Sequence, residues 1–238
     1  MTVPLVLLPG MNCSPRLWGG VVRELRLGPF DGPAREVVVV PLDRPNLDDQ
    51  VEALLDRLPQ RFAIGGLSLG AIVAMAVRRR APERVAGLIL AATSARPPTD
   101  AQRSAWTTQL AALAAGVTPR DFQEELLPLL IGADPAPGLR EQTLQMAEEV
   151  GSAALTAHLE LQLTRVDERP ALGDVTVPCA VVAAANDLVC PIERHTEIHH
   201  LVGGSDLVVI AGAPHLLALS HPHRVAEAIA AWLRRVDR

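Results

Sequence analysis

Short, nearly unbroken apolar runs alternate with amphipathic helical patterns along most of this 238-residue chain, and this alternation constrains its fold most. Runs rich in Val, Ile, Leu and Ala are typical of strands that helices cover on both faces. The pattern therefore predicts an α/β fold with a mostly parallel sheet wrapped by helices. The predicted strands are Val3–Leu8, Glu36–Pro41, Phe62–Gly66, Val85–Ala91, Cys179–Ala184 and Asp206–Ile210. Helices are expected from about Ser14 to Leu27, Leu47 to Leu58, Leu69 to Arg80 and Ile192 to Leu201, with a last one after Pro222.

One long segment interrupts the alternation. Between Arg96-Pro97-Pro98 and Arg169-Pro170 there is no strand pattern. Roughly four amphipathic helices are expected there instead, separated near Gly116, at residues 132–138 and at Gly151. An all-helical insertion between two strands of a parallel sheet predicts a cap over one edge of the sheet. The chain is thus expected to form a core of residues 1–96 and 171–238 and a helical cap of residues 97–170.

The strand at Phe62–Gly66 runs directly into the sequence Gly66-Leu67-Ser68-Leu69-Gly70, and a helical pattern follows. This is the strand–turn–helix context in which a G-x-S-x-G turn exposes a nucleophilic serine. Small residues two positions before and after the serine let the chain turn sharply. The helix that begins there adds positive potential where an oxyanion develops. Ser68 is the predicted nucleophile, and a glycine-rich turn without catalysis is the alternative.

A serine hydroxyl needs a base to become a nucleophile, and His215 is the predicted base. His215 directly follows the last predicted strand, so its side chain can lie over the carboxyl ends of the strands. The pKa of histidine lies near neutrality, which suits proton transfer. His221 and His223 are the nearest alternatives, but they lie beside Pro222 at the start of the terminal helix.

Asp187 is the predicted acid that orients this base. It comes after the penultimate strand, and the chain order Ser68, Asp187, His215 is the order that the serine elbow requires. Asp43, which ends an earlier strand, and Asp174, which precedes one, are the alternatives. Asp187 could also serve only as a turn-forming residue.

Two backbone N–H groups must converge on the developing oxyanion. One is expected from Leu69, the residue after the nucleophile. The other is expected from Met11, in the loop that follows the first strand, where Gly10 lets the chain turn tightly. Met11 could instead only line the pocket.

At these residues the chain resembles the capped α/β-hydrolases, a group that includes small esterases, enol-lactonases, the carboxylesterase of the biotin pathway and C–C bond hydrolases. The resemblance rests on Leu7–Trp18, Gly65–Gly70, Pro82–Val85, Ala213–His215 and Pro222. It implies an α/β-hydrolase fold, a helical lid and a triad of Ser68, Asp187 and His215. The chain departs from the family pattern in having Pro9 where a histidine is common, and none of its departures removes a triad member.

The sequence therefore predicts a serine hydrolase that acts on carboxylic esters, lactones or thioesters of small to medium apolar substrates. Trp18, Trp106 and Phe122 are candidate pocket residues, although each could simply pack in the interior. A C–C bond hydrolase or lyase could use the same triad for proton transfer, and a non-catalytic ligand-binding protein could share the fold. Because C–C bond enzymes of this type usually bind carboxylates, a buried arginine would favour them. Arg16, Arg96 and Arg169 are the candidates for such a role.

The net charge of −5 gives no footprint for nucleic acid, and no polybasic or long apolar stretch suggests a membrane. The only expected partner is a small-molecule substrate, and the chain is expected to be a monomer or homodimer. Cys13, Cys179 and Cys190 show no paired or metal-binding spacing. No metal or other cofactor is expected, and the absence of a recognisable signal peptide favours the cytoplasm.

Overall fold

The computed structural model describes residues 2–28 and 35–238, and six parallel strands form its centre. The order across the sheet is β2-β1-β3-β4-β5-β6, and every pairing between neighbours is parallel. The strands are β1 Leu5–Leu8, β2 Val37–Val39, β3 Phe62–Leu67, β4 Val85–Ala91, β5 Cys179–Ala184 and β6 Asp206–Ile210. All six strand predictions and the α/β fold class are confirmed, with β1 and β2 shorter than predicted.

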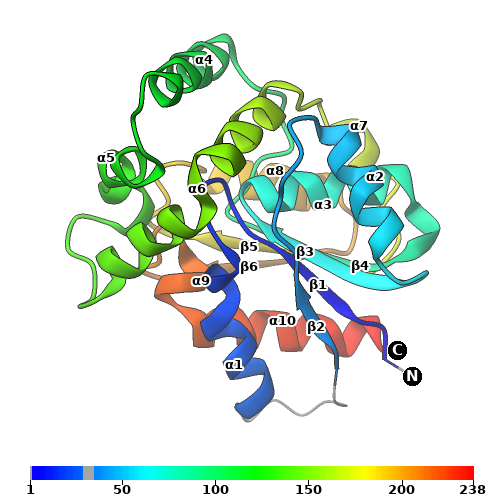
Figure 1. Ribbon diagram of the computed structural model, residues 1–238. Helices are drawn as coiled ribbons and strands as arrows, with labels where there is room; N and C mark the ends of the chain where they lie inside the picture. Colours follow the sequence, from blue (N-terminus) through cyan, green and yellow to red (C-terminus); the bar gives the residue numbers. More distant parts are fainter. Residues whose placement is uncertain (1, 29–34) are drawn as a thin grey trace.

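Helices cover both faces of the sheet, and for this reason its strands are apolar throughout. In β1, Leu5 and Leu7 belong to one hydrophobic cluster, and Val6 and Leu8 belong to the cluster on the opposite face. The first face is covered by α1 Gly19–Leu27 and α10 Pro222–Val236, and the second by α2 Leu47–Arg57, α3 Leu69–Arg80 and α8 Ile192–Leu201 (Figure 1). Short helical turns complete the layers at η1 Pro15–Trp18, η2 Pro82–Arg84, α7 Arg169–Leu172 and α9 Leu217–Ser220.

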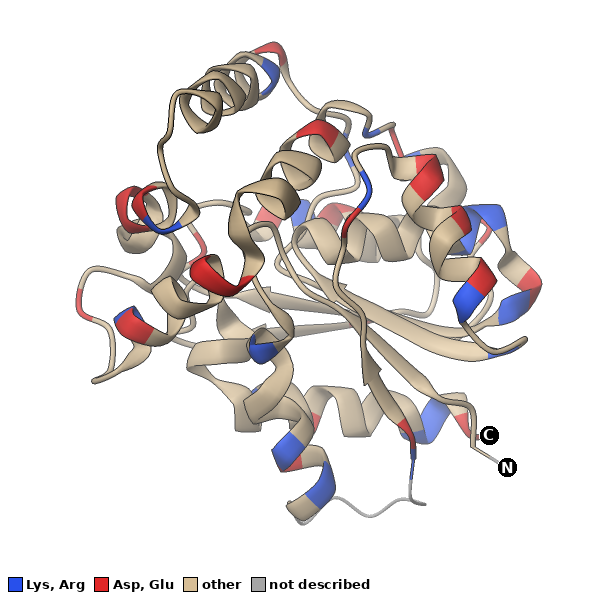
Figure 2. Cartoon of the chain, in the orientation of Figure 1, with Lys and Arg blue, Asp and Glu red and all other residues tan. Residues whose placement is uncertain are grey.

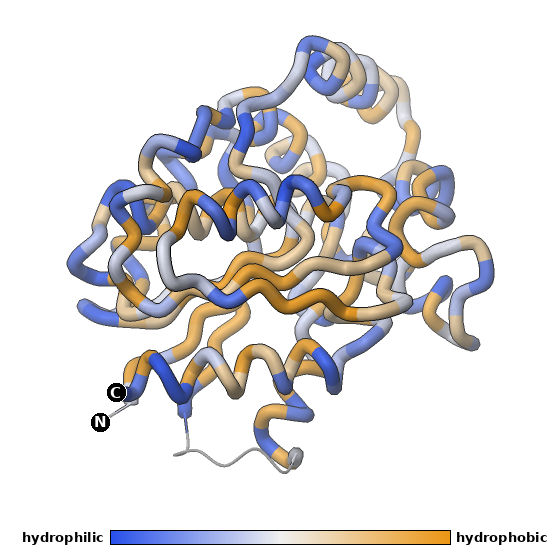
Figure 3. Tube along the Cα trace, turned by 180° about the vertical axis from the view of Figure 1, so that it is seen from behind, coloured by the Kyte–Doolittle hydropathy of each residue, from blue (hydrophilic) through white to orange (hydrophobic). Residues whose placement is uncertain are grey.

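Charged and apolar residues also occupy different parts of the structure. Arg, Asp and Glu gather on the helices and loops, and the described strands carry almost none (Figure 2). From behind, the strands form a hydrophobic band between more polar helices (Figure 3). Burial of these apolar side chains is the main favourable contribution to the stability of such a core.

The segment between β4 and β5 is helical, as predicted. It contains α4 Asp100–Ala114, α5 Pro119–Ile131 and α6 Leu139–Leu163. Thr99 and Thr118 begin α4 and α5 with reciprocal capping boxes, which satisfy backbone donors that would otherwise lack partners. The long helix α6 is interrupted at Gly151, whose φ of 73° and ψ of 167° are not helical, so the separation expected at Gly151 is present. These helices lie beyond the carboxyl ends of the central strands (Figure 1).

Candidate active site

Ser68 lies on a sharp turn between the end of β3 and the start of α3. Its φ of 54° and ψ of −113° place a non-glycine residue in an unfavourable backbone region, a strain that concentrates at functional sites. The Ser68 backbone is fixed, because its N–H donates to the carbonyl of Ala91 and its own carbonyl accepts from Thr93 Oγ1 at 3.0 Å. A Cβ atom added at Gly66 would lie 2.1 Å from the Gly70 carbonyl carbon, so the turn requires glycine there.

Asp187 and His215 form a buried hydrogen-bonded pair. The His215 Nδ1 atom lies 2.8 Å from Asp187 Oδ2, and both residues are buried. The other carboxylate oxygen, Oδ1, accepts from the backbone N–H groups of Val189 and Cys190, each at 2.8 Å. Three hydrogen bonds thus hold the Asp187 side chain in one orientation. Because its Oδ2 accepts from His215 Nδ1, the other ring nitrogen, Nε2, is available as a base.

Ser68 and His215 line the same cavity, which has a volume of about 410 Å³. The cavity lies between the strand ends and the helical insertion, since Leu67 and Thr93 form its floor and Trp106 of α4 part of its wall. Within the described residues no hydrogen bond reaches the Ser68 hydroxyl, so the hydroxyl remains free to meet a ligand. Nucleophile–base hydrogen bonds are often long in the absence of substrate.

The two backbone amides predicted to bind an oxyanion flank this serine. Leu69 is the first residue of α3, where N–H groups have no partner inside the helix. The loop after β1 packs against the elbow, because a Cβ atom at Gly10 would lie 3.7 Å from Ser68 Cβ. Met11 lines the cavity, and its N–H donates to no acceptor in the described part of the chain. Both amides are therefore available beside Ser68.

The residue after Met11 is tied to the helical insertion. Asn12 is fully buried at a φ of 55°. Its side-chain Nδ2 donates to the carbonyl of Pro119 and to Gln123 Oε1, both at 2.9 Å. Its backbone N–H donates to Nδ1 of His158 at 3.2 Å. The loop that carries Met11 is thus held from both α5 and α6.

His158 occupies a position that the sequence analysis did not anticipate. It lies within the pattern of α6, and it is buried. Its Nε2 lies 2.9 Å from the Leu42 carbonyl, so this nitrogen carries the proton while Nδ1 accepts from Asn12. Burial lowers the pKa of His158, which agrees with a neutral ring. Only the fold distinguishes a buried polar position on a helix from an exposed one.

A second buried histidine supports the elbow from the other side. His195 of α8 is inaccessible to solvent, and its Nε2 accepts from the N–H of Thr93 at 3.0 Å. Burial lowers the pKa of His195. Thr93 in turn donates its hydroxyl to the Ser68 carbonyl. His195 thus orders the segment that holds the elbow, and no sequence signal beyond its place in a helix indicated this.

Of the three predicted pocket aromatics, only Trp106 lines the cavity. The structure places Trp18 in the core beneath β1, where it is 1% exposed and its Nε1 donates to the carbonyl of Leu8 at 3.1 Å. Phe122 lies behind Trp106, in a small cluster with Leu155 and Leu159. Trp18 and Phe122 are therefore packing residues.

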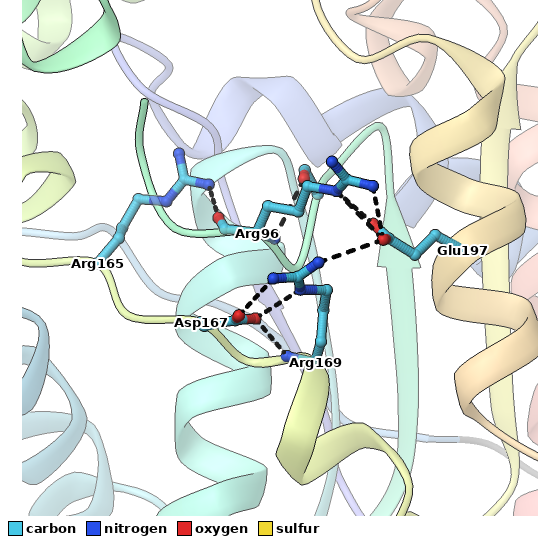
Figure 4. A network of polar contacts seen from close by, with 6 residues as sticks. Arg96, Arg165, Asp167, Arg169 and Glu197 are labelled. Carbon is cyan, nitrogen blue, oxygen red and sulfur yellow. Dashed lines mark hydrogen bonds and ion pairs between the residues drawn. The ribbon is translucent and has the colours of Figure 1, made fainter. Parts of the chain in front are cut away.

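The three arginines singled out from the sequence all pair with carboxylates. Arg96 and Arg169 share Glu197, and Arg169 also binds Asp167 (Figure 4). Arg16 pairs with Glu149 of α6 at an exposed position. A fourth arginine, Arg165, was not anticipated; it is buried and lines the cavity.

Cys13 and Cys190 line the cavity, but within the described residues their thiols form no hydrogen bond. Within residues 2–28 and 35–238 no group of three or more His, Cys, Asp or Glu side chains is placed to hold a metal ion. Burial raises the pKa of the thiols of Cys13, Cys179 and Cys190 to about 12, which keeps them protonated and unreactive at neutral pH. None of the helices described combines the length and apolar character that crossing a bilayer requires.

Comparison with known proteins places this site in a family. Residues 5–228 match the family described as the alpha/beta hydrolase family. The chain is 30% identical, over 93% of its length and 94% of the relative's, to the pimeloyl-(acyl-carrier protein) methyl ester esterase of Aromatoleum aromaticum. The chain belongs to the alpha/beta hydrolase family.

Solved structures agree. A thermophilic esterase from Thermogutta terrifontis, solved with malate bound, superposes with a TM-score of 0.85 and 25% identity, over all of this chain and 92% of that one. The enol-lactonase from Burkholderia xenovorans superposes with a TM-score of 0.84 and 17% identity, over 98% and 92% of the two chains, and supports the fold alone. The prediction of an ester-acting hydrolase of the alpha/beta type is confirmed.

Proposed function

We propose that the protein cleaves carboxylic esters of small to medium, largely apolar substrates through an acyl-enzyme formed on Ser68. One observation carries the proposal. A serine on a strained elbow and a histidine bonded to a buried carboxylate line one cavity. A volume of about 410 Å³ lies within the usual range of small-molecule sites.

The mechanism follows from the placement of these groups. Ser68 Oγ attacks the acyl carbon while His215 Nε2 takes its proton, and Asp187 stabilises the imidazolium that forms. The amides of Leu69 and Met11 donate to the oxyanion, a contribution worth about 3–4 kcal/mol per donor in comparable sites. His215 then gives its proton to the leaving alcohol, and water releases the acyl group by the same steps in reverse.

The similarity to a methyl ester esterase supports an ester with a small alcohol group. The cavity walls, which include Met11, Ile72, Leu126 and Leu130, suit an acyl chain of several methylenes. We assign the choice of acyl chain to residues 97–170, which act as a lid, because Trp106 and Leu126 of this segment face the cavity.

A second candidate is a C–C bond hydrolase or lyase that uses the same triad for proton transfer. The buried Arg165 favours it, because such enzymes bind carboxylate substrates. β-Diketone substrates separate the two reactions. If the protein turned over β-diketones and no esters, C–C bond cleavage would replace ester hydrolysis as its function.

Labelling with a fluorophosphonate tests the assignment of Ser68. One site should react, and Ser68→Ala should lose both labelling and ester turnover by about 10³-fold or more, because only residual catalysis survives without the nucleophile. Ser104→Ala, at an exposed position of α4, is the matched control and should behave as wild type. Undiminished labelling of Ser68→Ala would show that another residue is the nucleophile. A protein that is labelled but turns over no substrate of either class would be a binding protein.

A further inference from the structure

Arg165 follows α6 and reaches the wall of the cavity with an incomplete set of partners. The residue is 8% exposed. Its Nη1 donates to Gln162 Oε1 at 2.9 Å. Its Nη2 donates to the carbonyl of Arg96 at 2.8 Å (Figure 4). The guanidinium carbon lies 5.9 Å from the centre of the Trp106 ring, and Nε is buried without a partner. None of these neighbours carries a negative charge.

The nearby arginines differ in this respect. Arg96 donates to both carboxylate oxygens of Glu197, and Arg169 donates to Asp167. Arg165 forms no ion pair with any Asp or Glu in the described part of the chain. Burial lowers its pKa to about 10, so the side chain still carries its charge at neutral pH. A buried charge without a counter-ion is costly to a fold, because the desolvation is not offset.

The charged side chains that line the cavity are also positive. Arg96, Arg165 and Arg194 contribute to its lining, and no Asp or Glu is among the described residues that line it. A planar guanidinium offers a fork of N–H donors that matches a carboxylate. The remainder of the cavity, from Trp106 to Ser68, is mostly apolar. The cavity therefore combines one buried cationic group, apolar walls and the proposed nucleophile.

We propose that Arg165 binds a carboxylate of the substrate, so that the enzyme prefers esters that carry a second, ionised acid group. Half-esters of dicarboxylic acids fit this description, with the carboxylate at Arg165, the methylenes against the apolar wall and the ester carbonyl at Ser68. This inference rests on the proposed ester hydrolysis for its reaction but not for its binding.

Matched substrates test it. The mono-p-nitrophenyl ester of adipic acid and p-nitrophenyl hexanoate have similar chain lengths and differ in the terminal carboxylate. Wild type should prefer the adipate ester by about 10-fold or more in kcat/KM at low salt. Arg165→Met should lower kcat/KM for the adipate ester by about 10- to 100-fold, mainly by raising KM. Turnover of the hexanoate ester should change less than about threefold, because it makes no ionic contact. Arg165→Lys should restore part of the preference.

Arg103→Met is the matched control. Arg103 also donates to a backbone carbonyl, that of Leu163 at 2.7 Å, but it does not line the cavity. Its replacement should leave the preference intact. An equal loss for both esters in Arg165→Met, or a preference that survives in this variant, would overturn the role of Arg165 while hydrolysis of the hexanoate ester still supports the proposed function.

Binding of adipate, measured by calorimetry, keeps the test separate from turnover. If no ester is cleaved, adipate that binds wild type and not Arg165→Met still supports the inference, and equal binding overturns it. If Arg165→Met does not fold, adipate and hexanoate are compared as ligands of wild type. Tighter binding of adipate that weakens with salt supports the inference, and equal binding overturns it.

Discussion

The parallel-sheet core and the helical insertion contribute to the site in different ways. The core places Ser68, Asp187 and His215 just beyond the ends of β3, β5 and β6, so chain order alone brings them to one edge. The insertion contributes polar side chains from helix faces and a helix end, among them Gln123 and Arg165. The proposed catalytic groups, which follow strands, are thus placed by topology, whereas the groups on the insertion depend on how its helices pack.

The two regions are joined at the loop that carries Met11. Asn12 binds α5 and α6, and Ser14 Oγ donates to Glu149 of α6 at 2.6 Å. A rigid loop keeps an oxyanion donor in place without reorganisation, and such preorganisation is a large part of catalysis. The insertion, to which we assign the choice of acyl chain, also anchors the loop of the proposed oxyanion hole.

The largest effect is expected in the core. His215→Ala should lower ester turnover by about 10³-fold or more, because the proposed base is lost. His221→Ala should leave most of the activity, since its Nδ1 bonds to Ser220 Oγ and to no other group in the described part of the chain. Steady-state kinetics on a p-nitrophenyl ester measure both. If His221→Ala were the more damaging variant, the base would lie at the start of α10.

Asp187→Asn should cost about 10³- to 10⁴-fold in kcat, because an amide at this position favours the wrong imidazole tautomer. Asp43→Asn, the alternative acid, is the control and should stay near wild type. Circular dichroism verifies that both variants fold. Near-normal activity of Asp187→Asn together with loss in Asp43→Asn would assign the acid to the end of β2.

A smaller effect is expected where the insertion holds the core. Asn12→Gly removes the bonds to Pro119 and Gln123 without strain at a positive φ, so a loosened oxyanion loop should lower kcat by about 10- to 100-fold. KM should change little. Asn46→Ala, which removes only the cap of α2, is the control and should cost about 1 kcal/mol of stability with unchanged kcat. An unchanged kcat in Asn12→Gly would confine the insertion to substrate choice.

The contrast between the regions also explains what the sequence could predict. Apolar runs identify β3 and β5, and the motif around Ser68 with the fixed chain order identifies a candidate triad. Arg165 and His158 carry no such signal, because a buried polar residue on a helix face or just after a helix has the same local pattern as one on the surface. Trp18 was misplaced for a related reason. It lies near Met11 in sequence, but the turn η1 directs its ring beneath β1.

Trp106 and Phe122 test the insertion alone. Trp106→Ala should shift the preferred acyl chain length by about 1–3 kcal/mol in relative kcat/KM, because the ring lines the cavity. Phe122→Ala should shift it less, since that ring lies behind the first. A series of p-nitrophenyl esters of increasing chain length measures both, and phosphonate labelling of Ser68 should persist. Loss of labelling in a folded Trp106→Ala protein would contradict this division between the regions.

The smallest effect concerns acid sensitivity at the junction of the two regions. Because burial lowers the pKa of His158, the unfolded chain binds a proton there below about pH 6.5 that the folded chain does not bind. The contribution of His158 to the free energy of unfolding is therefore fully present above that pH. It is lost as the pH falls toward the pKa of His158 in the folded state. His195 and His221, whose pKa values are also lowered by burial, act in the same direction, and the charge of Asp43 opposes the shift at His158.

His158→Gln should have a lower free energy of unfolding than wild type, and this gap between the two proteins should be constant above about pH 7. Below about pH 6.5 the gap should close by up to about 1.4 kcal/mol per pH unit. The gap closes because wild type, and not the variant, loses stability to protonation of this ring. Urea unfolding between pH 5 and 8 measures it. Thr143→Val, also buried on α6 but without a titrating group, should show a gap that does not vary with pH. A pH-independent gap for His158→Gln would mean that the ring which holds Asn12 does not titrate on unfolding, so that the junction would be no more acid-sensitive than the core.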